Sequence, residues 1–63
     1  MLTLLKFERQ KRGLPAYSVA RKVGLTAGHY SRLENGRRGA SPRVAQRLAV
    51  LFRRSIEDLL SLV

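Results

Sequence analysis

The sequence predicts an all-α fold, a compact bundle of five short helices. Glycine, proline and helix-capping residues divide the 63-residue chain into five segments, and apolar residues recur within them at helical spacing. No segment alternates apolar and polar residues over the length of a strand. The connections between segments are a few residues long, which suits a compact bundle.

The first two helices are predicted at residues 2–12 and 16–23, and a glycine follows each of them. Pro15 suits the start of the second helix, because the N–H group that proline lacks would be unpaired there. Glu8 interrupts the apolar side of the first helix, so we expect a shift in register that gives Phe7 or Leu4 the core position. The other side chains expected in the core are Leu5, Val19, Ala20 and Val23.

Three further helices are predicted at residues 27–34, 42–53 and 56–62. A threonine or serine that can cap the N-terminus precedes each of them, and proline at the first position of the 42–53 helix strengthens that start. The capping residues are Thr26, Ser41 and Ser55. The side chains expected in the core are Tyr30, Leu33, Val44, Leu48, Leu51, Phe52, Ile56, Leu59 and Leu60.

The chain carries 13 Lys and Arg against 4 Asp and Glu, and its net charge of +9 favours an anionic partner. Residues 37–54 hold six arginines and no acid, whereas residues 55–63 hold two acids and no base. The absence of cysteine excludes a disulfide scaffold and a thiolate zinc site. No stretch approaches the ~18 apolar residues that a membrane span requires.

The length fits a single domain, residues 1–63, without room for a deep substrate cavity. One histidine and four acids supply no evident set of nucleophile, base and orienting group. We therefore expect no enzyme activity, no metal, no cofactor and no small-molecule substrate. The apolar start reaches Lys6 after five residues, unlike a secretory signal, and we expect a cytoplasmic protein.

The helices at 16–23 and 27–34 are separated only by the turn Gly24-Leu25-Thr26, and together they predict a helix-turn-helix at about residues 16–35. Ala20 and Gly24 are small, so the two helices can cross closely. The second helix then presents its N-terminal end and outer face to a partner. The major groove of DNA, about 12 Å wide, admits such a helix.

These residues resemble the lambda-repressor-like (XRE-type) DNA-binding family. The resemblance rests on RGL at 12–14, VARKVGLT at 19–26 and SRLENGRR at 31–38, and it continues through Ser41 and residues 55–60. It covers nearly the whole chain in the right order and spacing. The family implies five helices and sequence-specific binding to double-stranded DNA, usually as a homodimer on a palindromic operator.

The chain departs from the family pattern at several positions. The family usually has glutamine where this chain has Ala16, an apolar residue in place of Glu8, and glycine in place of Arg53. The first recognition-helix positions are Ala27 and Gly28, where many relatives carry hydrogen-bonding side chains. These differences bear on how the chain would contact bases and phosphates.

The candidates for reading bases are Ala27, Gly28, His29 and Arg32. The Arg32 guanidinium matches O6 and N7 of guanine, and the alternative is a phosphate contact or a solvated side chain. Ala27 either contacts a thymine methyl or only leaves space. Gly28 either lets the backbone approach the DNA closely or only leaves space. His29 either bonds a base or phosphate, or is an exposed histidine without a contact.

The candidates for phosphate contacts are Arg9, Ala16 through its backbone N–H, Tyr17, Arg37, Arg38 and Arg43. The alternative for the arginines is a solvated face, and for Tyr17 it is packing on the surface. The resemblance also implies an ion pair between Arg9 and Glu34, whose positions pair in some phage repressors of the family.

Ile56, Leu59, Leu62 and Val63 are the candidates for an apolar seam between two copies, although they could instead cap the core of one chain. The resemblance implies a homodimer at least on DNA.

We predict a transcriptional regulator, acting as a repressor by occupying its operator, although activators share this fold. The alternative is an antitoxin-type DNA-binding protein that also neutralises a protein partner. RNA binding is disfavoured by the few aromatic residues, and membrane binding by the five short capped helices.

Overall fold

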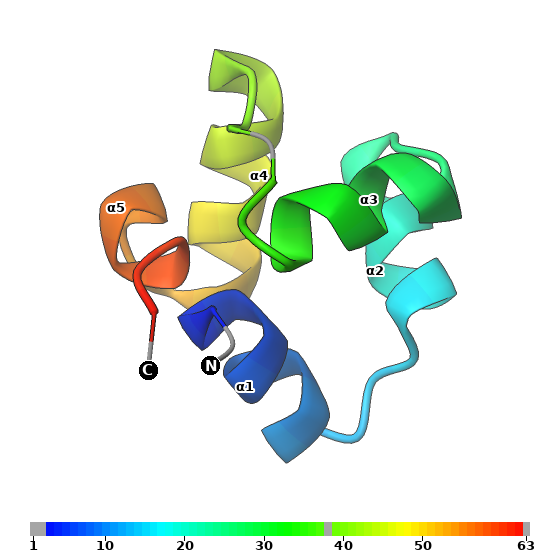
Figure 1. Cartoon of the computed structure of the whole chain (residues 1–63), viewed down its shortest axis with the longest axis horizontal. Helices are drawn as coiled ribbons and strands as arrows, with labels where there is room; N and C mark the ends of the chain where they lie inside the picture. The colour runs from blue at the N-terminus through cyan, green and yellow to red at the C-terminus, as the bar shows by residue number, and fades with distance from the viewer. Residues whose placement is uncertain (1–2, 38, 63) are drawn as a thin grey trace.

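The computed structural model of the chain describes residues 3–37 and 39–62. Within these residues the chain forms five helices and no strand, which confirms the all-α fold class (Figure 1). The helices are α1 (Leu4–Lys11), α2 (Ala16–Val23), α3 (Ala27–Glu34), α4 (Pro42–Phe52) and α5 (Ile56–Leu59). The bundle is compact, with a radius of gyration of 10.0 Å.

Side-chain hydroxyls set the starts of four helices, at Thr3, Thr26, Ser41 and Ser55. Each hydroxyl oxygen accepts a hydrogen bond from the backbone N–H three residues further on, which satisfies one of the free donors of the first turn. The start of α2 differs, because Pro15 precedes it without a side-chain bond. Gly24 ends α2 with a φ of 79°, a left-handed conformation that glycine adopts without a steric cost.

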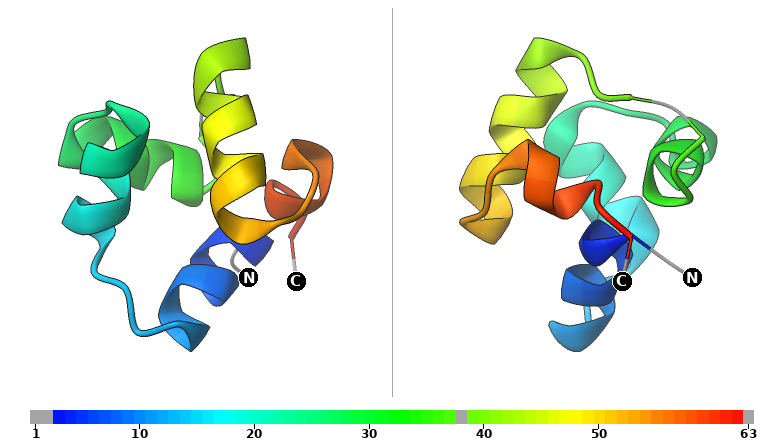
Figure 2. Two further views of the ribbon diagram at one scale, coloured as in Figure 1. Left: turned by 180° about the vertical axis from the view of Figure 1, so that it is seen from behind. Right: turned by 60° about the vertical axis from the view of Figure 1, so that its left-hand side comes forward.

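The core forms where all five helices meet, with α4 lying between α2 and α5 (Figure 2). Its buried apolar side chains are Leu5, Val19, Ala20, Val23, Tyr30, Leu33, Val44, Leu48, Phe52 and Leu59. Three further side chains expected in the core are only partly buried at its border, namely Leu51, Ile56 and Leu60. The helical periodicity therefore identified most of the core correctly.

The prediction for the inner face of α1 was correct for Leu5 and wrong for Phe7 and Leu4. Phe7 is 46% exposed, Leu4 is partly exposed, and Leu5 and Glu8 are the buried side chains of this helix. Residues three apart lie on the same helical face, so the helix directs a carboxylate into the bundle together with Leu5. The predicted start at Leu2 lies outside the described residues.

Basic side chains compensate the buried carboxylate of Glu8. Arg54 Nε lies 3.2 Å from one Glu8 oxygen, and Arg12 Nη2 lies 3.4 Å from the other. Arg12 also donates hydrogen bonds to the carbonyl oxygens of Leu51 and Phe52 at the end of α4. Glu8 thereby links α1 to the end of α4. An apolar residue at position 8 would only fill space.

The last helix is shorter than the predicted 56–62, because α5 ends at Leu59. The chain then turns to meet its own N-terminal segment: the N–H of Leu4 donates to the carbonyl of Ser61 at 2.8 Å. Thr3 and Leu62 form an isolated antiparallel bridge. Pairing with the segment before α1 thus replaces the final helical turn.

Helix α4 ends one residue before the predicted position 53. Arg53 follows it with φ 56° and ψ 42°, and it is the single non-glycine residue with a positive φ within 3–37 and 39–62. A side chain in this left-handed conformation is strained by about 1–2 kcal/mol.

Candidate nucleic-acid interface

Helices α2 and α3 pack together across a three-residue turn. The N–H of Leu25 donates to the carbonyl of Ala20 at 2.8 Å, and Thr26 caps α3. Val19, Ala20 and Val23 of α2 are buried. The turn is therefore fixed from both sides, and it places the start of α3 at the surface.

The two sides of α3 differ in burial. Tyr30, Leu33 and Glu34 are buried, while the opposite side carries exposed Ala27, Gly28 and Arg32. This outward side contains three of the four residues predicted to read bases. An added Cβ at Gly28 would have no atom within 4 Å, so the space in front of this residue is open.

Sequence reasoning missed two polar residues on the same outward side. Ser31 and Asn35 are exposed, and Asn35 Nδ2 donates to Ser31 Oγ at 3.4 Å. Ser31 lies four residues after Ala27, so helical spacing from that candidate was the signal that could have found it. The outward side of α3 thus offers a serine, an arginine and an asparagine for hydrogen bonding.

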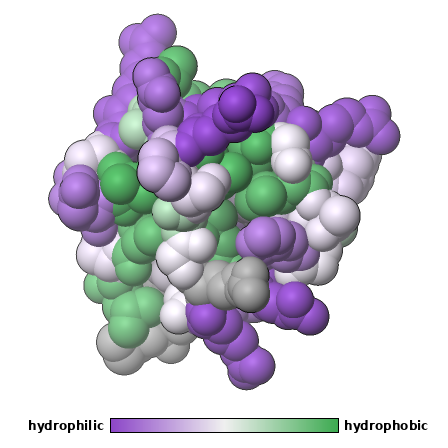
Figure 3. All heavy atoms as spheres, turned by 90° about the horizontal axis from the view of Figure 1, so that it is seen from above, coloured by the Kyte–Doolittle hydropathy of each residue, from purple (hydrophilic) through white to green (hydrophobic). Residues whose placement is uncertain are grey.

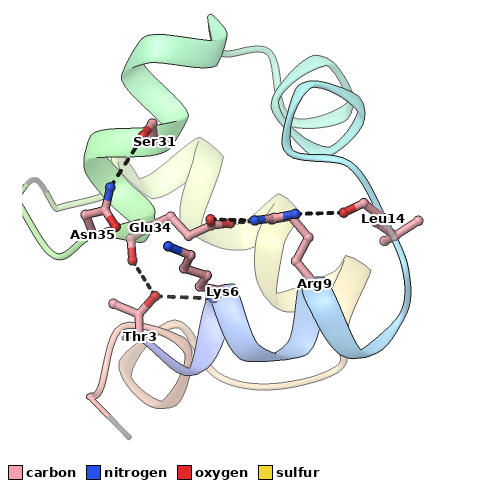
Figure 4. Close-up of polar contacts among 7 residues, drawn as sticks. All are labelled: Thr3, Lys6, Arg9, Leu14, Ser31, Glu34 and Asn35. Carbon is pink, nitrogen blue, oxygen red and sulfur yellow. Dashed lines mark hydrogen bonds and ion pairs between the residues drawn. The ribbon is translucent and has the colours of Figure 1, made fainter. Parts of the chain in front are cut away.

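The C-terminal end of α3 is held to α1 by an ion pair (Figure 4). Arg9 Nε and Nη2 donate to the two carboxylate oxygens of Glu34 at 2.7 and 2.9 Å, and Nη1 donates to the carbonyl of Leu14 at 2.8 Å. Thr3 Oγ1 donates to the backbone carbonyl of Glu34. We call these residues, Thr3, Arg9 and Glu34, the α3 brace.

The α3 brace changes the interpretation of Arg9. Its side chain is 13% exposed, and its guanidinium is occupied by Glu34 and Leu14. The ion pair implied by the family is therefore present, whereas the phosphate contact of Arg9 stays a prediction. The hydrogen bond to Glu34 and the charge of its carboxylate raise the pKa of Arg9 despite its burial.

The side chain of Tyr30 lies on the inner side of α3 with no exposed surface. Its hydroxyl has no hydrogen-bond partner among residues 3–37 and 39–62. Burial and the nearby carboxylate of Glu34 raise the pKa of Tyr30 above its ordinary value. The hydroxyl therefore stays protonated in the folded chain at pH values where an exposed tyrosine ionises.

His29 does not project freely from the outward side of α3. It is partly buried and lines a hollow of about 200 Å³ together with Leu25 and Leu33 of the helix-turn-helix and Ala40 and Ser41 of the following loop. The hollow shows that the start of α4 lies beside the start of α3. A contact from His29 would accordingly come from the edge of α3.

The residues predicted to contact phosphate lie on three segments. Tyr17, 65% exposed, and partly buried Ala16 begin α2, Arg37 is exposed in the loop after α3, and Arg43 is exposed at the second position of α4. Arg38 lies outside the described residues. The hollow beside His29 brings Ser41 and Val44 next to α3. Arg43 does not line this hollow, and it shares a groove with Lys22 at the end of α2 instead.

The candidates for an apolar seam have unlike environments. Leu59 is fully buried in the core of its own chain, so its assignment to a seam was wrong. Ile56 is partly buried, and Leu62 is 55% exposed. Val63 lies outside the described residues.

Within residues 3–37 and 39–62, no helix has the length and apolar character needed to cross a membrane. The same residues contain no cluster of three or more His, Asp or Glu side chains that could hold a metal ion.

A family model described as helix-turn-helix matches residues 5–59, which include all five helices except the first residue of α1. Comparisons with curated proteins and with solved structures gave no match.

Proposed function

Because the chain belongs to the lambda-repressor-like (XRE-type) helix-turn-helix family of DNA-binding regulators, we propose that it represses transcription by occupying an operator. In this proposal α3 enters the major groove with its outward side facing the bases. The observation that carries the proposal is the contrast between the two sides of α3. One side is fixed by the core and the α3 brace, and the other is exposed and polar.

Arg32 is the proposed base reader. The shorter side chains of Ser31 and Asn35 are proposed to add hydrogen bonds beside it. A bidentate contact between arginine and guanine contributes about 1–3 kcal/mol of discrimination. Ala27 and Gly28 leave room for close approach at the start of α3.

Phosphate contacts are proposed for Arg37 and Arg43, with Tyr17 and the N–H of Ala16 at the start of α2. The N-termini of α2 and α4 add the partial positive charge of their free N–H groups. These contacts would position the chain on the duplex and give affinity that does not depend on sequence. We further propose that two copies bind a palindromic operator.

The first experiment is a selection of bound sequences from random duplex DNA. A repeated, inverted half-site is expected, and its spacing reports how two copies are arranged. Recovery of random sequences would contradict sequence-specific binding. The affinity for the selected site should fall steeply with salt, with a slope of about −0.9 per neutralised phosphate.

The second experiment compares Arg32→Ala with Arg37→Ala, since both remove one exposed arginine. Arg32→Ala should weaken binding to the selected site by about 1–3 kcal/mol more than binding to random DNA. Arg37→Ala should weaken both by similar amounts. Equal losses for both DNAs in the Arg32 variant would make Arg32 a phosphate contact.

A further inference from the structure

A groove of about 550 Å³ lies between the end of α2 and the outer face of α4. Its apolar floor consists of Val23, Val50 and Leu51, and its basic rim consists of Lys22, Arg43 and Arg47. Gln46 also lines the groove, and we call these seven residues the α2–α4 groove. Val50 is 72% exposed, although most valines are buried. The space-filling view shows apolar patches bordered by hydrophilic side chains on one face of the molecule (Figure 3).

The basic rim of this groove reaches from α4 to the end of α2. Arg47 extends from α4 toward the end of α2, where one of its guanidinium nitrogens comes within 3.2 Å of the position that a Cβ on Gly24 would occupy. None of the three rim residues forms an ion pair with an acid of residues 3–37 and 39–62. The positive charge around the apolar floor is therefore not neutralised by this part of the chain.

The opposite combination of charge and apolar surface occurs at the C-terminal end. Glu57 and Asp58 are exposed and take part in no ion pair within the described residues, whereas Glu8 and Glu34 are buried and paired. Exposed Leu62 follows them. We call Glu57, Asp58 and Leu62 the acidic end. It is the only exposed negative patch that residues 3–37 and 39–62 provide.

We propose that the acidic end of one copy docks in the α2–α4 groove of a second copy. The carboxylates of Glu57 and Asp58 lie against the basic rim, and Leu62 covers Val50 on the floor. Opposite charges across an interface favour the correct partner and orientation. Both halves of this contact are supplied by one sequence, and an apolar floor gains nothing from a DNA phosphate.

Each copy carries both surfaces, so a two-fold dimer makes this contact twice, and the contact differs from a seam in which each residue meets its own counterpart. It specifies the surfaces by which two copies of the proposed regulator associate. It shares Arg43 with the proposed phosphate contacts, but the contact itself forms between two chains and can be tested without DNA.

The test is sedimentation equilibrium of three charge-reversed chains at low salt. Arg47→Glu and Glu57→Arg should each weaken self-association by about tenfold or more, because like charges then face each other. An equimolar mixture of the two should associate again, since each contact then joins opposite charges. The double variant Arg47→Glu/Glu57→Arg should associate alone for the same reason.

Arg21→Glu is the matched control, because Arg21 is exposed on α2 outside the groove. It should retain at least half of the wild-type association constant, and Val50→Asp should lose association despite an unchanged rim. Cooperative thermal unfolding of every variant confirms that it is folded.

A wild-type chain that is monomeric throughout, or a mixture that does not associate, would overturn the proposal. Retained association in both single variants would overturn it too. Binding of each variant to a single half-site of the selected DNA is measured separately, so a failure of DNA recognition remains distinguishable.

Discussion

Tyr30 contributes its ring to the core, but its hydroxyl has no partner among the described residues. A buried polar group without a hydrogen bond costs about 1–3 kcal/mol. Tyr30→Phe keeps the shape of the ring and removes this cost, so we expect the free energy of unfolding to rise by about 1 kcal/mol. Urea denaturation measures the change. Tyr17→Phe, which alters an exposed tyrosine, should leave it within about 0.5 kcal/mol.

The raised pKa of Tyr30 also predicts a dependence on alkaline pH. Above pH ~10 the unfolded tyrosine loses its proton, while the folded one keeps it. The folded state then binds more protons, so stability is complete below this pH and falls above it by about 1.4 kcal/mol per pH unit. The difference in unfolding free energy between Tyr30→Phe and the wild type should therefore grow between about pH 10 and 11. A constant difference would contradict the raised pKa.

Glu34 is the acceptor at the centre of the α3 brace, with its side chain 6% exposed. Glu34→Gln leaves the Arg9 guanidinium, 13% exposed, without its neutralising charge. We expect a loss of about 2–3 kcal/mol in the free energy of unfolding, below the range for removing one partner of a fully buried pair. Glu57→Gln is the exposed control, with an expected loss below about 0.5 kcal/mol. Equal losses would show that the brace contributes no stability.

At the scale of the helices, the end of α4 carries the clearest strain. Arg53 adopts a left-handed conformation that glycine adopts without a steric cost. Arg53→Gly removes this strain, but it also increases the freedom of the unfolded chain. We expect a net gain of about 0.5–1 kcal/mol, measured as a higher midpoint in urea. Arg54→Gly should instead be destabilising, because Arg54 bonds Glu8.

The starts and ends of α2 and α3 agree with the sequence prediction because their signals are local. Thr26 caps α3 through an atom three residues away, and Gly24 ends α2 through its own φ. The inner face of α1 and the end of α5 depend instead on distant partners. Glu8 is buried because Arg54, 46 residues away, meets it, and α5 ends early because residue 61 bonds Leu4. No short sequence pattern records such contacts.

In the candidate site, too, some residues follow from local signals and others depend on distant partners. Arg32 follows from the motif and its helical position, and it is exposed as expected. The inward direction of Arg9 depends on Leu14 and Glu34, which meet it only in the folded chain. The orientation of His29 depends on the loop at residues 39–41, which the helical pattern does not describe.

For the molecule as a whole, the net charge of +9 on 63 residues has opposite consequences for folding and for binding. Like charges repel one another in the compact state, and salt screens that repulsion. We expect the thermal midpoint to rise between about 20 and 200 mM NaCl, while affinity for DNA falls over the same range. Calorimetry and fluorescence anisotropy measure the two trends. A falling midpoint would show that the ion pairs of Glu8 and Glu34 outweigh the repulsion.

The bridge between Thr3 and Leu62 brings the first and last described segments into contact. New ends could therefore be opened elsewhere while a short flexible peptide joins the old ones, since circular permutation succeeds at exposed loops. The loop between α3 and α4 is such a place, because Gly36, Arg37 and Gly39 are exposed there. Such a permuted chain would show whether the bundle still folds when the helix-turn-helix is no longer joined to α4 along the chain.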